Sequence, residues 1–138
     1  MDASIIILFA FVIVVGALLF AFVTFGKRPQ RLDVEKYRTR WLTIEQSLIR
    51  DNEASYHLAV MNGDKLVDQA LKDLGYSGKT MGDRLKATRG QLSHRDAMWK
   101  AHKLRNKIAH EPDVKVKYDH ARMALAGFKR ALKDLGAI

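Results

Sequence analysis

Residues 3–25 read ASIIILFAFVIVVGALLFAFVTF and contain no charged side chain. In a helix these 23 residues rise about 1.5 Å each, so the run is roughly 34 Å long, enough to cross the hydrocarbon core of a membrane. A secretory signal peptide would begin with positive charge and have a shorter apolar core, whereas the only charge before this run is the acidic Asp2. A buried core helix is the other alternative, but the rest of the chain is too small to surround one. We therefore expect residues 1–26 to form an uncleaved transmembrane anchor.

Three basic residues follow the apolar run closely: Lys27, Arg28 and Arg31. No Lys or Arg precedes it. The positive-inside rule therefore predicts a single-pass protein of the plasma membrane, with its N-terminus outside and residues 27–138 in the cytoplasm. The chain contains no cysteine, which excludes disulfides, a thiolate nucleophile and cysteine-ligated metals. With 138 residues in all, it has room for one cytoplasmic domain behind the anchor.

Beyond Pro29, where the anchor joins the domain, apolar residues recur at spacings of three and four, which is typical of amphipathic helices. Four stripes follow this spacing: Tyr37, Trp41, Ile44 and Leu48; Tyr56, Val60, Gly63, Val67, Ala70 and Leu74; Ala97, Ala101, Leu104 and Ile108; and Ala121, Leu125, Phe128, Leu132 and Leu135. No segment alternates with a period of two for long enough to predict a strand. We expect an all-α protein in which a single transmembrane helix is followed by a four-helix-bundle-like cytoplasmic domain.

The local sequence also predicts where several of these helices begin and end. The first is expected to end near Arg50, and Asp51-Asn52 offers a plausible N-cap for the second. Ser93 with Asp96 resembles an acidic capping box at the start of the third. Between the second and third helices, the glycine-rich stretch is expected to hold a short helix over residues 80–88.

Two features that contain glycine each allow two interpretations. Asn62-Gly63 read alone predicts a turn, but Gly63 lies on an apolar stripe, so we favour a continuous helix with a close helix–helix contact at that glycine. The hexapeptide Ala-Leu-Lys-Asp-Leu-Gly occurs at residues 70–75 and again at 131–136. It reflects either a duplicated hairpin or two amphipathic helix ends with a glycine cap. We favour two glycine-capped helix ends because the sequences that flank the two copies differ.

The strongest local signal for chemistry is the stretch KLRNKIAHEP at residues 103–112. His102, Asn106 and His110 are spaced by four residues and so lie on one stripe of the predicted helix, with Arg105 beside it. An arginine can hold a phosphate through two N–H groups. A histidine can exchange protons near neutral pH, so this set of side chains suits phosphodiester chemistry.

The same residues also have a structural interpretation. Arg105 could pair with a carboxylate such as that of Glu111, while Asn106 and His110 satisfy carbonyl groups at the helix end. A metal site is not predicted, because His102 and His110 are about 12 Å apart along a helix axis and one ion cannot bridge them.

The sequence Arg105-Asn106-x-x-x-His110 resembles the Arg-x(4–6)-His motif of HEPN (higher eukaryotes and prokaryotes nucleotide-binding) domains, in which it ends a helix of an all-α bundle. The resemblance implies a metal-independent endoribonuclease, or an RNA- or nucleotide-binding domain, that uses no cofactor. It implies that Arg105 binds phosphate and stabilises the transition state, that His110 is the general acid–base, and that Asn106 assists. The RNA 2′-hydroxyl would be the nucleophile, and the motifs of two protomers would meet in a homodimer.

Positive charge is concentrated around this motif. The chain has a net charge of +9, and residues 84–110 hold eight Lys and Arg against a single Asp, a net of +7. Such a patch binds phosphate backbones, and Arg95, His102, Lys103 and Lys107 are the candidate substrate-binding residues. Anionic lipid headgroups are a rival ligand for a tethered domain. The alternative function is thus a non-catalytic, membrane-tethered interaction or dimerisation module that uses its basic face for anionic lipid or a protein partner.

Overall fold

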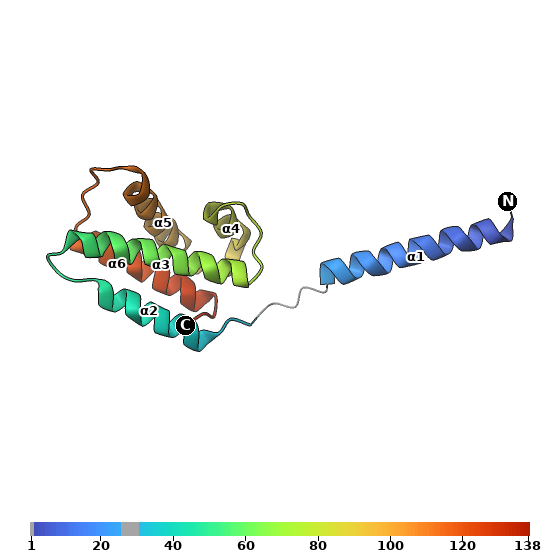
Figure 1. Ribbon diagram of the computed structural model, residues 1–138, viewed down its shortest axis with the longest axis horizontal. Coiled ribbons are helices and arrows are strands. Elements are labelled where there is room, and N and C mark those ends of the chain that lie inside the picture. Colours follow the sequence, from blue (N-terminus) through green and yellow to red (C-terminus); the bar gives the residue numbers. More distant parts are fainter. Residues whose placement is uncertain (1, 26–30) are drawn as a thin grey trace. The chain divides into compact units, whose positions relative to one another are not determined.

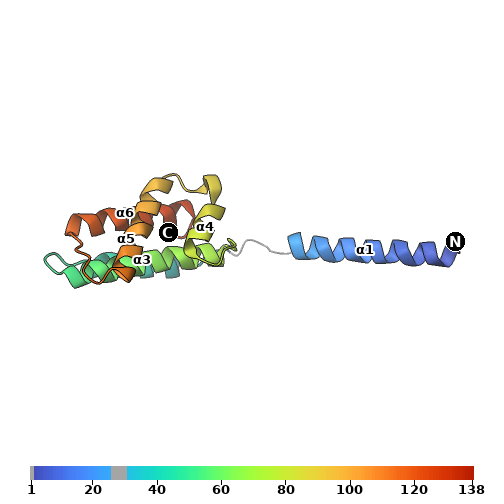
Figure 2. The same cartoon turned by 90° about the horizontal axis from the view of Figure 1, so that it is seen from above.

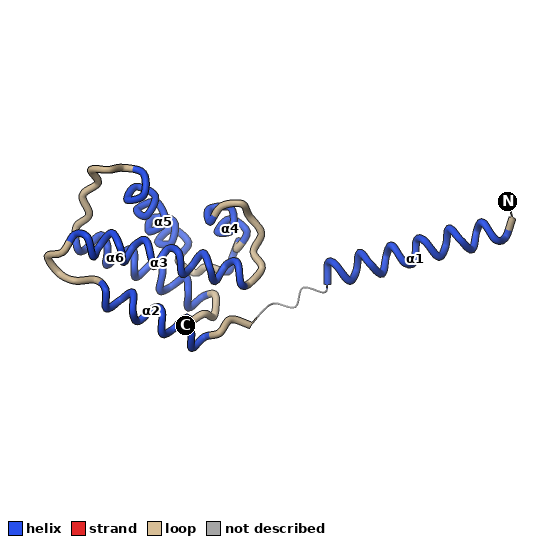
Figure 3. Tube along the Cα trace, viewed as in Figure 1, coloured by secondary structure: helices blue, strands red, loops and turns tan. Residues whose placement is uncertain are grey.

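The structure, a computed structural model, describes residues 2–25 and 31–138. In chain order its elements are α1 (Ala3–Phe25), α2 (Val34–Ser47), α3 (Glu53–Asp73), α4 (Met81–Ala87), the 3-10 helix η1 (Arg89–Gln91), α5 (Arg95–His110) and α6 (Tyr118–Asp134). The described residues form helices and loops and no strand, so the expected all-α class is confirmed (Figure 3). Lys27, Arg28 and Pro29, which the sequence places at the join, lie outside the described residues.

The chain divides into two compact units, residues 1–30 and 31–138. The first contains α1, which is long and apolar enough to cross a membrane. Its large apolar side chains, such as those of Ile7, Phe9 and Phe22, are exposed. Within its unit α1 therefore lacks the buried face of a core helix and has the length and composition of a membrane span.

In the second unit, α3 and α6 lie between α2 on one side and α4 and α5 on the other (Figure 1), and Figure 2 shows the same helices from above. α6 packs against both α3 and α5, and α3 is also in contact with α2, α4 and α5. Leu71 of α3 and Phe128 and Leu132 of α6 are fully buried. Every buried hydrophobic side chain among the described residues belongs to this unit, so residues 31–138 contain a complete core of their own.

Two glycines allow α6 to approach its neighbours closely. The expected contact at Gly63 is confirmed: α3 runs through it unbroken, and a Cβ there would lie 2.6 Å from Cδ2 of Phe128. On the other side of α6, a Cβ at Gly127 would lie 2.8 Å from the carbonyl oxygen of Ala97 in α5. α6 is thus held tightly between α3 and α5, the two helices that build the pocket described below.

The repeated hexapeptide ends a helix at both of its positions. Gly75 and Gly136 have positive φ angles of 83° and 71°, which favour glycine. The next N–H groups, of Tyr76 and Ala137, donate to carbonyl oxygens five residues earlier at 3.0 and 2.8 Å. Both ends are therefore Schellman motifs. The interpretation as two glycine-capped helix ends is confirmed.

The other predicted helix ends agree with the structure to within a few residues. α2 ends at Ser47 rather than near Arg50, and Asn52 caps α3 as expected, accepting a hydrogen bond through its side chain. The short helix predicted over residues 80–88 is α4. Thr80 caps it in a reciprocal capping box with Asp83.

The predicted capping box of Ser93 and Asp96 is wrong. His94 is the N-cap of α5, and no side chain caps this helix. The backbone N–H and the hydroxyl of Ser93 both donate to Oδ2 of Asp134, at 2.8 and 2.7 Å. Ser93 therefore ties the start of α5 to the end of α6 instead of capping its own helix.

Candidate functional site

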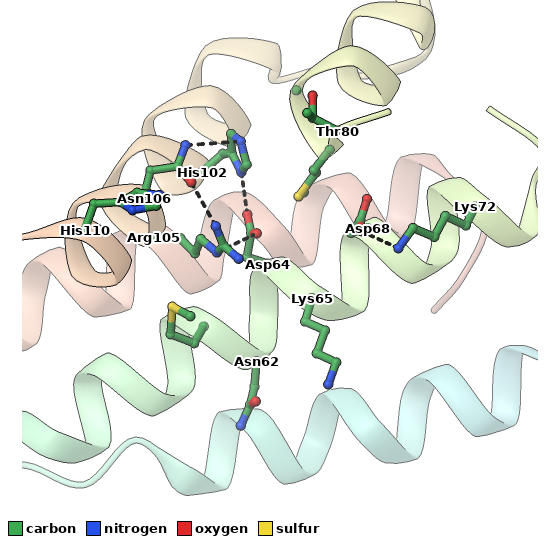
Figure 4. A pocket seen from close by; sticks show the side chains of 13 residues that line it. Asn62, Asp64, Lys65, Asp68, Lys72, Thr80, His102, Arg105, Asn106 and His110 are labelled. Atoms are coloured by element: carbon green, nitrogen blue, oxygen red, sulfur yellow. Dashed lines mark hydrogen bonds and ion pairs between the residues drawn. The ribbon is translucent and has the colours of Figure 1, made fainter. Parts of the chain in front are cut away.

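A pocket of about 890 Å³ lies between α3, α5 and the start of α4 (Figure 4). Its lining residues are Met61, Asn62, Asp64, Lys65, Asp68 and Lys72 of α3, Thr80, Met81 and Gly82 at the start of α4, and His102, Arg105, Asn106 and His110 of α5. The polar stripe predicted on residues 102–110 therefore faces this pocket along its whole length.

The structure brings together four of the seven site residues that the sequence predicts. Arg105, Asn106 and His110, the proposed catalytic residues, line the pocket together with His102. His110 is exposed, Arg105 and Asn106 are half-buried, and His102 is buried. The four side chains therefore share one pocket, although their environments differ.

The other three predicted residues lie elsewhere on α5. Arg95, Lys103 and Lys107 are exposed and do not line the pocket. They lie on the same helix as the motif, outside the cavity, where they can add positive charge to its surroundings.

Four side chains form a closed polar ring in the wall of the pocket (Figure 4). Nδ1 of His102 lies 2.8 Å from Oδ1 of Asp64, and Nε2 of His102 lies 3.4 Å from Nδ2 of Asn106. Nη1 of Arg105 donates to Oδ1 of Asn106 at 3.0 Å. Nε of Arg105 completes the ring, 3.4 Å from Oδ2 of Asp64.

The contact between Arg105 and Asp64 is an ion pair without a hydrogen bond. At 3.4 Å the charges attract, but Nε is buried and has no hydrogen-bond partner among the described residues. The carboxylate that meets Arg105 is thus that of Asp64 in α3, whereas the structural interpretation of the sequence pointed to one such as Glu111. Asn106 is occupied by Arg105 and His102.

A second aspartate of α3, Asp68, forms ion pairs with two basic side chains at the other end of the pocket. Asp68 accepts a 2.7 Å hydrogen bond from Nε of Arg84 and lies 2.9 Å from Nζ of Lys72. Arg84 is buried and also donates to the carbonyl oxygen of Gly78 at 2.7 Å. Arg84 is therefore an internal ion-pair partner that holds α4 to α3, and its charge does not belong to the solvent-exposed patch.

Because of these ion pairs, not all of the positive charge of residues 84–110 is exposed to solvent. Two of the eight basic residues, Arg84 and Arg105, face aspartates of α3. The remaining six are exposed: Lys86, Arg89, Arg95, Lys100, Lys103 and Lys107. The pocket itself is nearly balanced, with three Lys or Arg side chains and two aspartates, so the positive field comes mainly from the surface around it.

Sequence reasoning did not single out Asp64 or Asp68. Each directly follows a residue of an apolar stripe, Gly63 or Val67. Their position beside the stripe could have identified them, because an aspartate at the edge of a buried stripe is partly desolvated and needs a cation or a hydrogen-bond donor. In residues 2–25 and 31–138, no group of three or more His, Cys, Asp or Glu is placed to hold a metal ion.

Comparison of the chain with models of protein families, with curated proteins and with solved structures finds no match. The fold and the site define a helical domain with a cation and imidazoles at one pocket, in a chain with a helix apolar enough to span a membrane. What the pocket binds and does must therefore be inferred from its own side chains.

Proposed function

We propose that residues 31–138 form a HEPN-like domain that binds RNA and cleaves it at the pocket between α3 and α5. The observation that carries the proposal is the gathering of Arg105, Asn106 and His110 around one cavity, with the imidazole of His110 exposed. A motif that only ended a helix would not need its cation and its imidazole at the same cavity. The resemblance of this motif to that of HEPN domains supplies the type of reaction.

In the proposed reaction the RNA 2′-oxygen attacks the adjacent phosphorus, and the bond from phosphorus to the 5′-oxygen breaks. The products are a 2′,3′-cyclic phosphate and a 5′-hydroxyl end. His110 accepts the proton of the 2′-hydroxyl, and the imidazolium so formed gives that proton to the leaving 5′-oxygen. Arg105 stabilises the charge that develops on the phosphate oxygens, and Asn106 orients the guanidinium through its 3.0 Å hydrogen bond. The step uses groups of the RNA and the protein alone.

We further propose that the domain is a homodimer whose two motifs face one another, as the HEPN resemblance implies. His110 ends α5 and is open to solvent, so a second protomer can approach it without displacing core residues. The exposed basic side chains of α5, Lys100, Lys103 and Lys107, would bind the phosphate backbone on either side of the cleaved bond.

The proposed location is the cytoplasmic face of the plasma membrane, with α1 as the span and the N-terminus outside. Because the chain has no cysteine, single cysteines can report this topology directly. We expect Asp2→Cys to react with a membrane-impermeant maleimide in intact cells, and Ser77→Cys, in an exposed loop, to react only after the membrane is opened. The opposite labelling pattern would show that the orientation is reversed.

The activity is tested with the full chain in detergent micelles, on single-stranded RNA in the presence of EDTA. We expect cyclic-phosphate ends, and a loss of about 100-fold or more in rate for His110→Ala, since general acid–base groups contribute about that much. His120→Ala is the matched control, because His120 is exposed on α6 and lies outside the pocket. Arg105→Ala should weaken RNA binding as well as cleavage.

The outcomes separate the two classes of function. Equal cleavage by the wild-type chain and His110→Ala would remove the proposed role of His110. Absence of any cleavage, combined with binding to phosphatidylserine vesicles that is lost when Lys100, Lys103 and Lys107 are changed to Gln, would favour the non-catalytic, lipid-binding module. The average mass of residues 31–138 in solution, measured by light scattering, tests the dimer.

A further inference from the structure

The buried carboxylate of Asp64 has no part in the reaction proposed above, although it lies at the centre of the polar ring. Asp64 is only 3% exposed, on α3 next to Gly63, where that helix is pressed against α6. A buried carboxylate is costly unless it is paired. Its two partners are His102 and Arg105, both of which belong to α5. Asp64 is therefore a fixed negative charge against which α5 side chains are arranged.

The ring determines which nitrogen of His102 carries the hydrogen. An ionised carboxylate only accepts, so the nitrogen next to Asp64, Nδ1, must donate. Oδ1 of Asn106 accepts from Arg105, so the amide presents its NH₂ group to Nε2 of His102, which must accept. All four contacts are satisfied together by a neutral His102 with its hydrogen on Nδ1.

Other arrangements break at least one contact of the ring. A hydrogen on Nε2 of His102 would face the NH₂ group of Asn106, donor against donor. Rotating the amide of Asn106 would relieve that conflict, but it would turn the same NH₂ group toward Nη1 of Arg105, which is also a donor. Trp99 packs edge-on against His102, with ring centroids 5.9 Å apart, so the imidazole is held by packing as well.

We infer that Asp64 is a positioning residue of the proposed ribonuclease site: it fixes the tautomer of His102, and through His102 and its own charge it orients Asn106 and Arg105. Nε of Arg105 faces Asp64 in an ion pair and Nη1 donates to Asn106, which leaves Nη2 as the guanidinium nitrogen with neither kind of contact among the described residues. The ring thus leaves one defined nitrogen of the guanidinium, Nη2, to donate to a phosphate.

The two histidines of the pocket have different roles. His102 is buried and both of its ring nitrogens have partners, so it orients its neighbours and does not exchange protons with a substrate. His110 is exposed and lies outside the ring. The effect of Asp64 on cleavage rests on the proposed function, whereas its effect on the His102 tautomer does not.

The first measurement therefore needs no activity. The ring nitrogens of His102 are observed by nitrogen-15 NMR in the full chain in micelles, labelled at histidine and assigned with His102→Gln. We expect the wild-type signals of a neutral imidazole with its hydrogen on Nδ1. In Asp64→Ala the share of His102 with its hydrogen on Nε2 should rise, because Nδ1 loses its acceptor and Arg105 loses the ion pair that holds it, and with it the amide of Asn106, in place. A wild-type imidazole with its hydrogen on Nε2 would overturn the inference, and that result requires no change to Asp64.

The second measurement is cleavage by Asp64→Asn, which keeps the size of the side chain and removes its charge. We expect kcat to fall by about tenfold to 100-fold, because misplacing a group by an ångström or less has effects of this size. The control is Asp73→Asn: Asp73 is also on α3 and accepts hydrogen bonds from Tyr37 and Gln69, but it does not line the pocket. Wild-type kcat in a folded Asp64→Asn chain would overturn the positioning role. If the wild-type chain cleaves no RNA, the proposed function fails, and the tautomer alone decides the inference.

Discussion

Gly127 lies where α6 packs against α5, and the change Gly127→Ala tests how closely the two helices are packed. The added Cβ would lie 2.8 Å from the carbonyl oxygen and 3.1 Å from the carbonyl carbon of Ala97. Ordinary contacts begin at 3.4 Å, so the helices would have to separate by about 0.6 Å at this point. The atoms in the way belong to the backbone of α5, so no side-chain rotation can relieve the contact.

The expected effect is the difference between two opposing contributions. Overpacking in a core costs about 1–3 kcal/mol. Replacing glycine by alanine inside a helix returns up to about 1 kcal/mol. We expect Gly127→Ala to lower the free energy of unfolding by about 1 kcal/mol, which corresponds to a decrease of roughly 4 °C or more in Tm for a unit of this size.

The assay is thermal and urea unfolding of residues 31–138, followed by circular dichroism. Gly82→Ala is the matched control, because Gly82 is also helical but its Cβ would have no neighbour closer than 3.7 Å. That change should leave stability equal or raise it by about 0.5 kcal/mol. A Gly127→Ala domain that is as stable as the wild type, or more stable, would refute the close approach of α6 to α5.

Two further predictions concern ion pairs and hydrogen bonds away from the reacting groups. Arg84→Met leaves Asp68 without its buried cation and should lower the free energy of unfolding in urea by about 2 kcal/mol. The control is Lys86→Met, at an exposed residue, which should change that free energy by less than about 0.5 kcal/mol. Similar losses in both variants would contradict the internal role of Arg84. Burial alone would raise the pKa of Asp134, but hydrogen bonds from the side chain and backbone of Ser93 outweigh it and lower this pKa. The carboxylate therefore stabilises the fold above the pKa of the unfolded chain, and this stabilisation is lost as the pH falls below about 4. The Tm advantage of the wild type over Asp134→Asn should shrink over that range, and a constant difference would contradict the assignment.

Most of the helices could be predicted from the sequence because their causes are local. The Asn52 cap and the glycine-capped ends at Gly75 and Gly136 depend on residues within a few positions of one another. The close contact at Gly63 could be predicted as well, since a glycine on an apolar stripe leaves room for another helix. The start of α5 could not, because Ser93 is bonded to an aspartate 41 positions away, and no local pattern reveals such a partner.

The site likewise contains residues that the local sequence reveals and one that it does not. Asn106 and His110 can be singled out because their spacing places them on one helical stripe with Arg105 beside it, and in the structure all three line one pocket. Asp64 was not identified, because it lies 38 positions before His102 and becomes its partner only when α3 and α5 pack together.

The sequence by itself determined that this protein has one apolar helix long enough to span a membrane, followed by amphipathic helices. It also determined that two imidazoles share one helical stripe with a cation beside it. Those properties follow from the rise and periodicity of a single helix. Only the tertiary structure decided that Asp64 and Asp68 neutralise Arg105 and Arg84, and that His102 is enclosed while His110 is open. The physical reason is that charge pairing and burial depend on which helices are adjacent in space, and helix packing brings together residues that are far apart in the chain.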